Sequence, residues 1–225
     1  LVNIQATNAP HMLFSEDNVV AKFNHNKSQW GLFYNLSARN FKKTYTDIDE
    51  TYVLENKTIH RVQEGLHDQN KHFTHNIDLS YNLTEQDKYV FNVVFRNSVY
   101  DAPCLNQSNK LYDAADADNY IFSRLKNKQS SYTPSLDLYY QRTLPKNQML
   151  TMSVTGTLMH TDNNRLYHEY TPQAEDLAMI ETDVTGNKRS IIGEAIYDKR
   201  FKFLVFSAGL RHYQMYARNE YAGSS

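Results

Sequence analysis

The stretch that decides the fold is FTHNIDLSYNLT, residues 73–84. One set of alternate positions carries Phe73, His75, Ile77, Leu79, Tyr81 and Leu83, and the other carries Thr74, Asn76, Asp78, Ser80, Asn82 and Thr84. Successive side chains of a β-strand point to opposite faces, so this period of two predicts a strand with one largely apolar and one polar face. The length exceeds the roughly five or six residues of a typical globular strand and covers the roughly nine to eleven that a membrane-crossing strand needs.

The same alternation, less strict in places, returns along the chain. Between residues 148 and 160, leucine, methionine and valine alternate with threonine and serine. The chain has no run of eighteen apolar residues, so the sequence predicts no membrane-spanning helix. We predict eight strands, at residues 18–24, 28–41, 72–83, 88–100, 134–144, 148–160, 190–198 and 202–216.

The connections between these strands alternate in length. The short ones are 24–27, 84–87, 145–147 and 199–201, and the long ones are 42–71, 101–133 and 161–189. Transmembrane barrels have short periplasmic turns and long extracellular loops, whereas structureless loops near thirty residues are unusual in a compact soluble domain. The sequence therefore predicts an all-β fold, an antiparallel meander of about eight long strands that is part of a larger transmembrane β-barrel, with residues 1–225 as a single unit.

The direction of the strands adds a further expectation. If the short turns are periplasmic, the strand at 18–24 runs inward and the strand at 202–216 runs outward. Both chain ends would then lie outside the cell, whereas complete single-chain barrels keep both ends in the periplasm. Eight strands can close a small barrel, but these eight have the wrong phase. We therefore expect this chain to be an internal part of a barrel with further strands on both sides.

Composition agrees with this reading and excludes others. The chain has 24 Lys and Arg against 25 Asp and Glu, which gives no electrostatic case for binding nucleic acid. It is polar, with a mean hydropathy of -0.67, yet it contains 17 Tyr and 11 Phe. A barrel that is wet inside and apolar only on its outer band fits this combination. Cys104 is the only cysteine, which excludes a disulfide within the chain and a cysteine-based metal site.

Four segments resemble the barrel of TonB-dependent outer-membrane receptors, in particular the Bacteroidetes-type outer-membrane β-barrel family. They are YTPSLDLYY at 132–140, LPKNQ at 144–148, SIIGEAIY at 190–197 and SAGLRH at 207–212, and the resemblance spans most of 18–221. It implies a protein of the bacterial outer membrane that imports a scarce nutrient. It also implies several partners: membrane lipid, an N-terminal plug domain, the TonB energy-transducing complex, an unknown nutrient ligand and, as one candidate, a surface lipoprotein.

Loops carry function on rigid scaffolds, so the candidate ligand-binding residues are sought in the long connections. An acidic loop beside aromatic side chains could hold a sugar or a cation, although it lacks the spacing and turn glycine of a calcium loop. The candidates are Tyr112, Asp113, Asp116, Asp118 and Tyr120 in the second long connection and His168 and Glu169 in the third. The plain alternative is that all seven are solvated loop residues.

The sequence predicts no metal site, no cofactor and no enzyme. His72 and His75 are three apart on a strand, so they point to opposite faces and cannot share a metal. His60 and His67 lie in a long connection, where solvated histidines are the rule. The chain has no nucleophile elbow, phosphate loop, paired-cysteine motif or zinc-helix motif.

Two sets of strand residues follow from the barrel hypothesis. Polar residues that alternate with the apolar ones should face the lumen: Asn76, Asp78, Asn82, Asp137 and Gln141. Aromatic residues near strand ends should form girdles at the membrane interfaces: Trp30, Tyr89, Tyr100, Tyr132, Tyr197 and Tyr213. Two other functions stay open, a passive porin or structural barrel and a soluble, secreted β-rich binding module.

Overall fold

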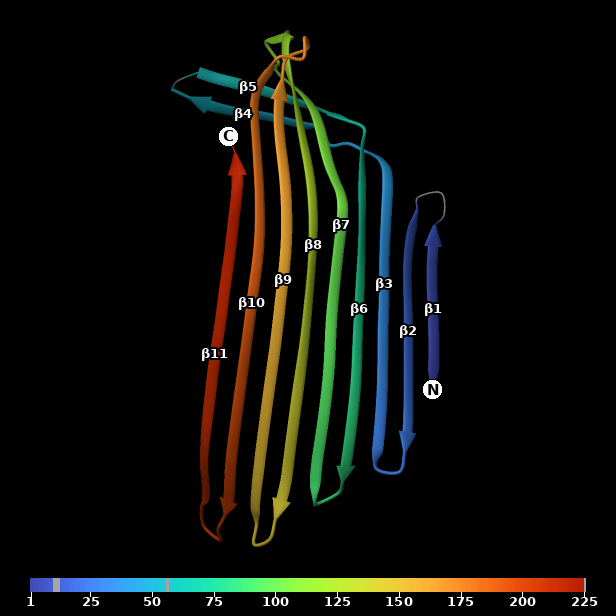
Figure 1. Cartoon of the computed structure of the whole chain (residues 1–225), viewed down its shortest axis with the longest axis vertical. Helices are drawn as coiled ribbons and strands as arrows, with labels where there is room; N and C mark the ends of the chain where they lie inside the picture. The colour runs from blue at the N-terminus through green and yellow to red at the C-terminus, as the bar shows by residue number, and fades with distance from the viewer. Residues whose placement is uncertain (10–12, 56, 225) are drawn as a thin grey trace.

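The computed structural model describes residues 1–9, 13–55 and 57–224, and these form one antiparallel sheet of eleven strands (Figure 1). The strands are β1 (Val2–Ala9), β2 (Phe14–His25), β3 (Ser28–Thr44), β4 (Ile48–Leu54), β5 (Lys57–Leu66), β6 (Asp68–Glu85), β7 (Tyr89–Asp113), β8 (Asp116–Leu144), β9 (Gln148–Tyr170), β10 (Asp176–Arg200) and β11 (Val205–Ser224). No helix in these ranges has the length and apolarity needed to cross a membrane. The predicted all-β antiparallel architecture is confirmed.

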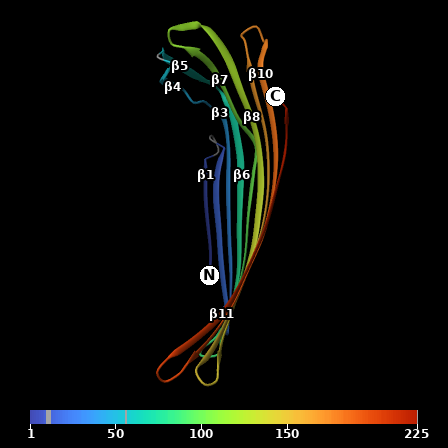
Figure 2. The same cartoon turned by 90° about the vertical axis from the view of Figure 1, so that its left-hand side faces the viewer.

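The strands follow one another across the sheet in the order β1-β2-β3-β6-β7-β8-β9-β10-β11. The β4–β5 hairpin departs from this path, because β5 pairs with the upper part of β7 while β6 pairs with its lower part. The sheet does not close, so β1 and β11 are its two edges. Seen from the side, it is twisted and its upper part bends over (Figure 2).

The bend coincides with irregular pairing on three neighbouring strands. The register shifts between Phe41 and Thr44 on β3, between Lys71 and Phe73 on β6 and between Ala102 and Leu105 on β7. A β-bulge bends its strand and increases the local twist, and bulges are frequent at barrel rims. These three register shifts therefore lie between the regular lower sheet and the upper hairpins, which run in a different direction.

The sheet has almost no enclosed core. Among the described residues, the buried side chains are Ala102, Leu111, Asn109 and Ser123, and all four lie in the upper part of β7 and β8. Elsewhere neither face is covered, so each strand is held by backbone hydrogen bonds and side-chain pairs to its two neighbours.

The prediction of eight strands is wrong because it omits β1, β4 and β5. The strand β1 has only a short alternation, Val2, Ile4 and Ala6, and its pairing with β2 forms it. The β4–β5 hairpin mixes polar and apolar residues on both faces, so its sequence lacks a clear period of two, and the strands are identified by their backbone pairing.

The long connections 42–71, 101–133 and 161–189 are also not loops. The segments 101–133 and 161–189 are continuations of the neighbouring strands, and 42–71 contains the hairpin of β4 and β5. The turn between β7 and β8 has only two residues, Ala114 and Ala115. From Asp116 to Tyr132, β8 extends about 50 Å at roughly 3.3 Å per residue. Most side chains there are polar, and the few apolar ones, such as Ile121 and Phe122, fall on both faces, so the segment shows no alternation.

The expectation that both chain ends lie at the end of the long connections holds only for the C-terminus. The missed strand β1 runs opposite to β2 and begins at Val2, beside Ala21, which places the N-terminal residues well down the sheet (Figure 1). The predicted short turns at the lower end are confirmed. Asn26, Asp87 and Asn147 adopt positive φ angles there, of 51°, 61° and 57°, a conformation that Asn and Asp tolerate better than most residues.

One carboxylate joins two of these lower turns. Glu85 accepts hydrogen bonds from Lys27 Nζ at 2.8 Å and from Lys88 Nζ at 2.6 Å. Hydrogen bonds and attraction from both lysines lower the pKa of Glu85 to about 2 from its ordinary 4.5. Because the folded pKa is depressed, the stabilisation is complete above about pH 4.5 and is lost as the pH falls through 2.

We therefore predict that the Glu85 carboxyl carbon titrates near pH 2 in an NMR experiment on isotope-labelled protein. Lys27→Gln and Lys88→Gln should each move the midpoint upward, because each removes one donor. A midpoint near 4.5 in the unaltered protein would show that the two turns are not bridged.

Candidate functional site

The register of the strands assigns every side chain to a face, because directly paired residues point to the same side. Following the pairs across the sheet gives one face a continuous apolar band. Its members are Trp30, Leu32, Tyr34, Leu36 and Ala38 on β3; Ile77, Leu79, Tyr81 and Leu83 on β6; Phe91, Val93 and Phe95 on β7; Tyr132, Pro134, Leu136, Leu138 and Tyr140 on β8; Leu150, Met152, Val154 and Leu158 on β9; Ile191, Ala195 and Tyr197 on β10; and Phe206, Ala208 and Leu210 on β11. Many of these side chains are exposed, including Leu158 at 49% and Leu210 at 82%.

The band has a defined height. On β8 it runs from Tyr132 to Tyr140, which is about 27 Å along the strand at roughly 3.3 Å per residue. A tilted strand that crosses a membrane needs about nine to eleven residues, and the nine residues of this stretch match the lower end of that range. The apolar band therefore has the dimension of a bilayer core.

The band also crosses the strands obliquely. The middle residue of the band is Tyr34 on β3 and Ala208 on β11. Following the cross-strand partners from Tyr34 across the sheet, however, leads to Tyr216 on β11 and not to Ala208. The centre thus drifts by about eight residues over the six strand spacings from β3 to β11. At roughly 3.3 Å per residue and 4.8 Å between strands, this corresponds to strands tilted by about 40° from the normal of the band. Transmembrane barrel strands tilt by about 35–45°.

Aromatic side chains follow the lower part of the band across four strands. The ring centroids of Trp30 and Tyr81 are 4.4 Å apart, those of Tyr81 and Phe91 are 6.3 Å apart, and those of Phe91 and Tyr140 are 6.5 Å apart. At the upper boundary, Tyr132 lies 5.2 Å from the ring of His160. Aromatic residues thus line both boundaries of the band.

Four of the six residues predicted to form a girdle share one face of the sheet. Trp30, Tyr89, Tyr132 and Tyr197 lie on the face of the apolar band. Tyr100 and Tyr213 do not, because Tyr100 pairs with Thr74 and Tyr213 pairs with Ile192, both on the opposite face. Closeness to a strand end suggested these two residues, but the face depends on the register.

The opposite face, called the polar face below, holds all five residues predicted to share it: Asn76, Asp78, Asn82, Asp137 and Gln141. Arg96 forms an ion pair with Asp137, and its Nε lies 4.0 Å from Asp78 Oδ2. Asn35 donates to Asn18 at 2.8 Å and accepts from Asn76 at 3.2 Å. Side chains on this face thus satisfy one another across strands.

The upper hairpins place the seven candidate ligand-binding residues in three surroundings. A hollow of about 390 Å³ on the polar face includes Tyr112, Asp113 and Glu169 among its lining. Asp116, Asp118 and Tyr120 lie outside this hollow, at the start of β8, and His168 instead bonds through Nε2 to Asp176 at 2.8 Å. The predicted group is therefore only partly assembled.

The hollow contains residues that the sequence interpretation missed. Tyr52 and Arg61, from β4 and β5, line it together with Leu111 and Ile121. Nothing in the sequence pointed to the first two, because the β4–β5 hairpin was not recognised. An arginine, carboxylates, tyrosines and an apolar floor can hold a polar ligand with some hydrophobic surface.

Two tyrosines beside this region are held by carboxylates. The hydroxyl of Tyr112 donates to Glu64 at 2.7 Å, and this bond, with burial, raises the pKa of Tyr112. Burial and a hydrogen bond to Glu169 raise the pKa of Tyr167 to about 12. Lys110 Nζ lies 4.7 Å from the ring centroid of Tyr112. Both hydroxyls therefore stay protonated and act as donors near neutral pH.

Metal chemistry has no support in the described ranges, where no three His, Cys, Asp or Glu side chains are grouped closely enough to hold an ion. The prediction that His72 and His75 point apart is confirmed. His72 pairs with Arg39 on the polar face, whereas His75 hydrogen-bonds to the hydroxyl of Tyr34 on the other.

The comparisons with known proteins assign no family. No family model matches the sequence, and no curated protein matches it either.

The charge cluster on the polar face gives a testable energy. In a double-mutant cycle with Arg96→Gln and Asp137→Asn, we predict a coupling of about 0.2–1 kcal/mol, because both groups are partly exposed and screened by solvent. Stability is measured by urea unfolding of the reconstituted protein. The matched control combines Arg96→Gln with Glu194→Gln, a carboxylate on the same face of β10, three strand spacings from β7, and this distant pair should show no coupling. Equal coupling in the two cycles would contradict the assignment.

Proposed function

We propose that this chain forms part of the wall of a bacterial outer-membrane β-barrel, with the apolar band against lipid and the polar face toward the lumen. The observation that carries the proposal is the oblique apolar band. Its height fits a bilayer core, and its drift across the strands fits the tilt of barrel strands. Exposed apolar surface of this extent is unfavourable in water, and contact with acyl chains removes it from water.

The open edges of the sheet bear on how such a barrel closes. In a membrane, every backbone donor and acceptor needs a partner, so a spanning sheet must close on itself. Here β1 and β11 run in the same direction, because nine strands alternate along the path between them. Pairing β11 with β1 would be parallel. An antiparallel barrel therefore needs an odd number of further strands between these two edges, supplied by another segment or another chain.

A soluble binding module has less support. In that alternative the apolar band would pack against a second sheet, but no described residue covers it. Strands of 23 to 29 residues, as in β7 to β10, are also far longer than the usual three to ten of globular sheets.

We further propose that the barrel is an uptake receptor of the TonB-dependent kind. The resemblance at 132–148 and 190–212 supports this, as do the long hairpins gathered at one end of the sheet (Figure 1). In this function the upper hairpins capture the nutrient, and the hollow at Arg61 and Tyr112 offers it polar groups. The polar face then encloses the plug domain, whose movement opens the path.

The chain's single tryptophan tests the membrane setting. Trp30 lies in the apolar band and is 53% exposed. In the protein reconstituted into vesicles, lipids with brominated acyl chains should quench its fluorescence strongly, because the indole touches lipid. The matched control combines Trp30→Phe with Phe33→Trp, which moves the indole to the polar face of the same strand. It should be quenched by aqueous acrylamide instead. Identical quenching profiles for the two proteins would refute the lipid-facing assignment.

A conductance measurement separates an uptake receptor from a passive porin. Because a plug fills the lumen of a receptor, the closed barrel together with its plug domain should give no steady ionic current in a planar bilayer. Stable open-channel steps would contradict the receptor proposal and favour a porin, while leaving the barrel wall unaffected.

A further inference from the structure

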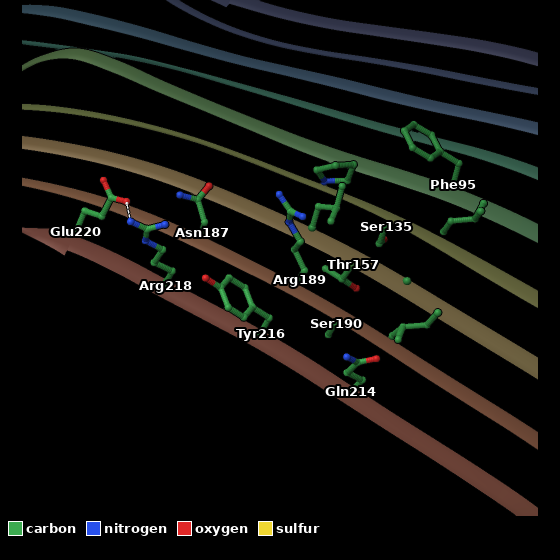
Figure 3. A pocket seen from close by; sticks show the side chains of 15 residues that line it. Phe95, Ser135, Thr157, Asn187, Arg189, Ser190, Gln214, Tyr216, Arg218 and Glu220 are labelled. Atoms are coloured by element: carbon green, nitrogen blue, oxygen red, sulfur yellow. Dashed lines mark ion pairs between the residues drawn. The ribbon is translucent and has the colours of Figure 1, made fainter.

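A hollow lies on the face of the apolar band, across β7 to β11 (Figure 3). Its volume is about 1070 Å³, at the upper end of the roughly 300–1,000 Å³ of small-molecule sites. It is an open groove whose lower part is apolar, with Leu136, Leu158 and Ile191 in its lining. Gly156 makes the depression, because no heavy atom lies within 4 Å of the position that a Cβ would take there.

The upper part of the groove is polar and carries two arginines. Arg189 and Arg218 come from β10 and β11, and Figure 3 shows them beside Tyr216. Arg189 is the next residue above Ile191 on this face, so it lies at the upper boundary of the apolar band on β10. Arg218 lies farther up, eight residues beyond Leu210 on β11, and pairs with Asn187. Arg189 would therefore lie at the level of lipid headgroups, with Arg218 above it.

The charges at this boundary leave a net positive site. Arg218 is paired with Glu220, with 2.8 Å between Nη2 and Oε1. Arg189 forms no ion pair with another described residue and is exposed. Two arginines and one glutamate give a net charge of about +1. The neighbouring Asn187 is occupied by a hydrogen bond to His160 at 2.8 Å.

We propose that this groove binds one anionic membrane lipid, with an acyl chain in the depression at Gly156 and the phosphate held by Arg189 and Arg218. This inference rests on the proposed outer-membrane barrel. An apolar groove that faces a bilayer is filled by acyl chains, and basic groups at the interface attract anionic headgroups. Arginine suits this position because its planar guanidinium binds phosphate oxygens in pairs.

The combination of features distinguishes this site from the rest of the apolar band. Elsewhere the band contacts lipid without selecting it, because no unpaired cation lies beside a depression of this size among the described residues. The net positive charge beside the groove therefore favours an anionic lipid as its occupant. It is a lipid with a phosphate that carries net negative charge, not a zwitterionic one.

The experiment uses a tryptophan placed at the groove. The reporter protein carries Trp30→Phe and Ile191→Trp, which places the indole in the apolar part of the groove beside Gly156, and is reconstituted into phosphatidylcholine vesicles. Brominated phosphatidylglycerol or brominated phosphatidylcholine is then added at the same mole fraction. One basic residue at a membrane surface favours an anionic lipid about fivefold. We therefore expect the reporter to select brominated phosphatidylglycerol over brominated phosphatidylcholine by about fivefold, and less at high salt.

Variants test each part of the site. Arg189→Gln should bring the selectivity close to one, and Glu220→Gln should increase it, because it frees Arg218. Gly156→Leu should fill the depression and reduce quenching of the reporter. The matched control is Arg142→Gln, on the same face but near the lower boundary of the band, where Arg142 pairs with Leu150. It should leave the selectivity unchanged.

The outcomes separate this inference from the proposed function. Equal quenching by both lipids, or selectivity that survives Arg189→Gln, would overturn the lipid site and leave the barrel wall intact. Absence of quenching by either lipid would overturn the proposed membrane wall itself. Spin-labelled lipids give a second measurement without a reporter substitution. The motionally restricted fraction of phosphatidylglycerol should exceed that of phosphatidylcholine in the unaltered protein, and Arg189→Gln should reduce this excess.

Discussion

The register between neighbouring strands is the constraint on which this structure depends. Neither face of the lower sheet is covered, so each strand is held in place mainly by backbone hydrogen bonds and side-chain pairs with its neighbours. A slip of one residue would exchange the apolar and polar faces of a whole strand. In β6 it would move Ile77 and Leu79 to the side of Arg96 and Asp137. The two faces of the lower sheet therefore stay distinct only because the pairing there is regular on every strand.

The oblique course of the apolar band follows from the same register and explains features that single strands do not. It places Arg189 at the upper boundary on β10 and Arg218 above the band on β11, although residues in the same rows on β3 lie inside the band. Above the band both faces become polar, and the bulges on β3, β6 and β7 redirect the chain into the upper hairpins. One sheet thus forms both a lower part with an oblique apolar band and upper hairpins that run in a different direction.

The sequence predicted the strands well where one face is apolar and poorly elsewhere. Alternation in 73–84 and 148–160 identified real strands and their faces, because one side must avoid water while the other need not. The β4–β5 hairpin and the upper half of β8 have no such contrast, so they were interpreted as loops. The candidate site was predicted incompletely for the same reason. Tyr112, Asp113 and Glu169 were found, but Arg61 reaches the hollow only through the pairing of β5 with β7.

The most direct test of the two-faced wall is a substituted-cysteine scan along residues 132–140 of β8, with Cys104→Ser as the background. Reactivity toward a water-soluble maleimide is measured in intact membranes. The wall predicts a period of two. Cysteines at Thr133, Ser135, Asp137 and Tyr139 should react, whereas cysteines at Pro134, Leu136, Leu138 and Tyr140 should be protected by lipid. Uniform reactivity along the strand, or protection of the odd-numbered positions instead, would contradict the assignment of the apolar band to the membrane.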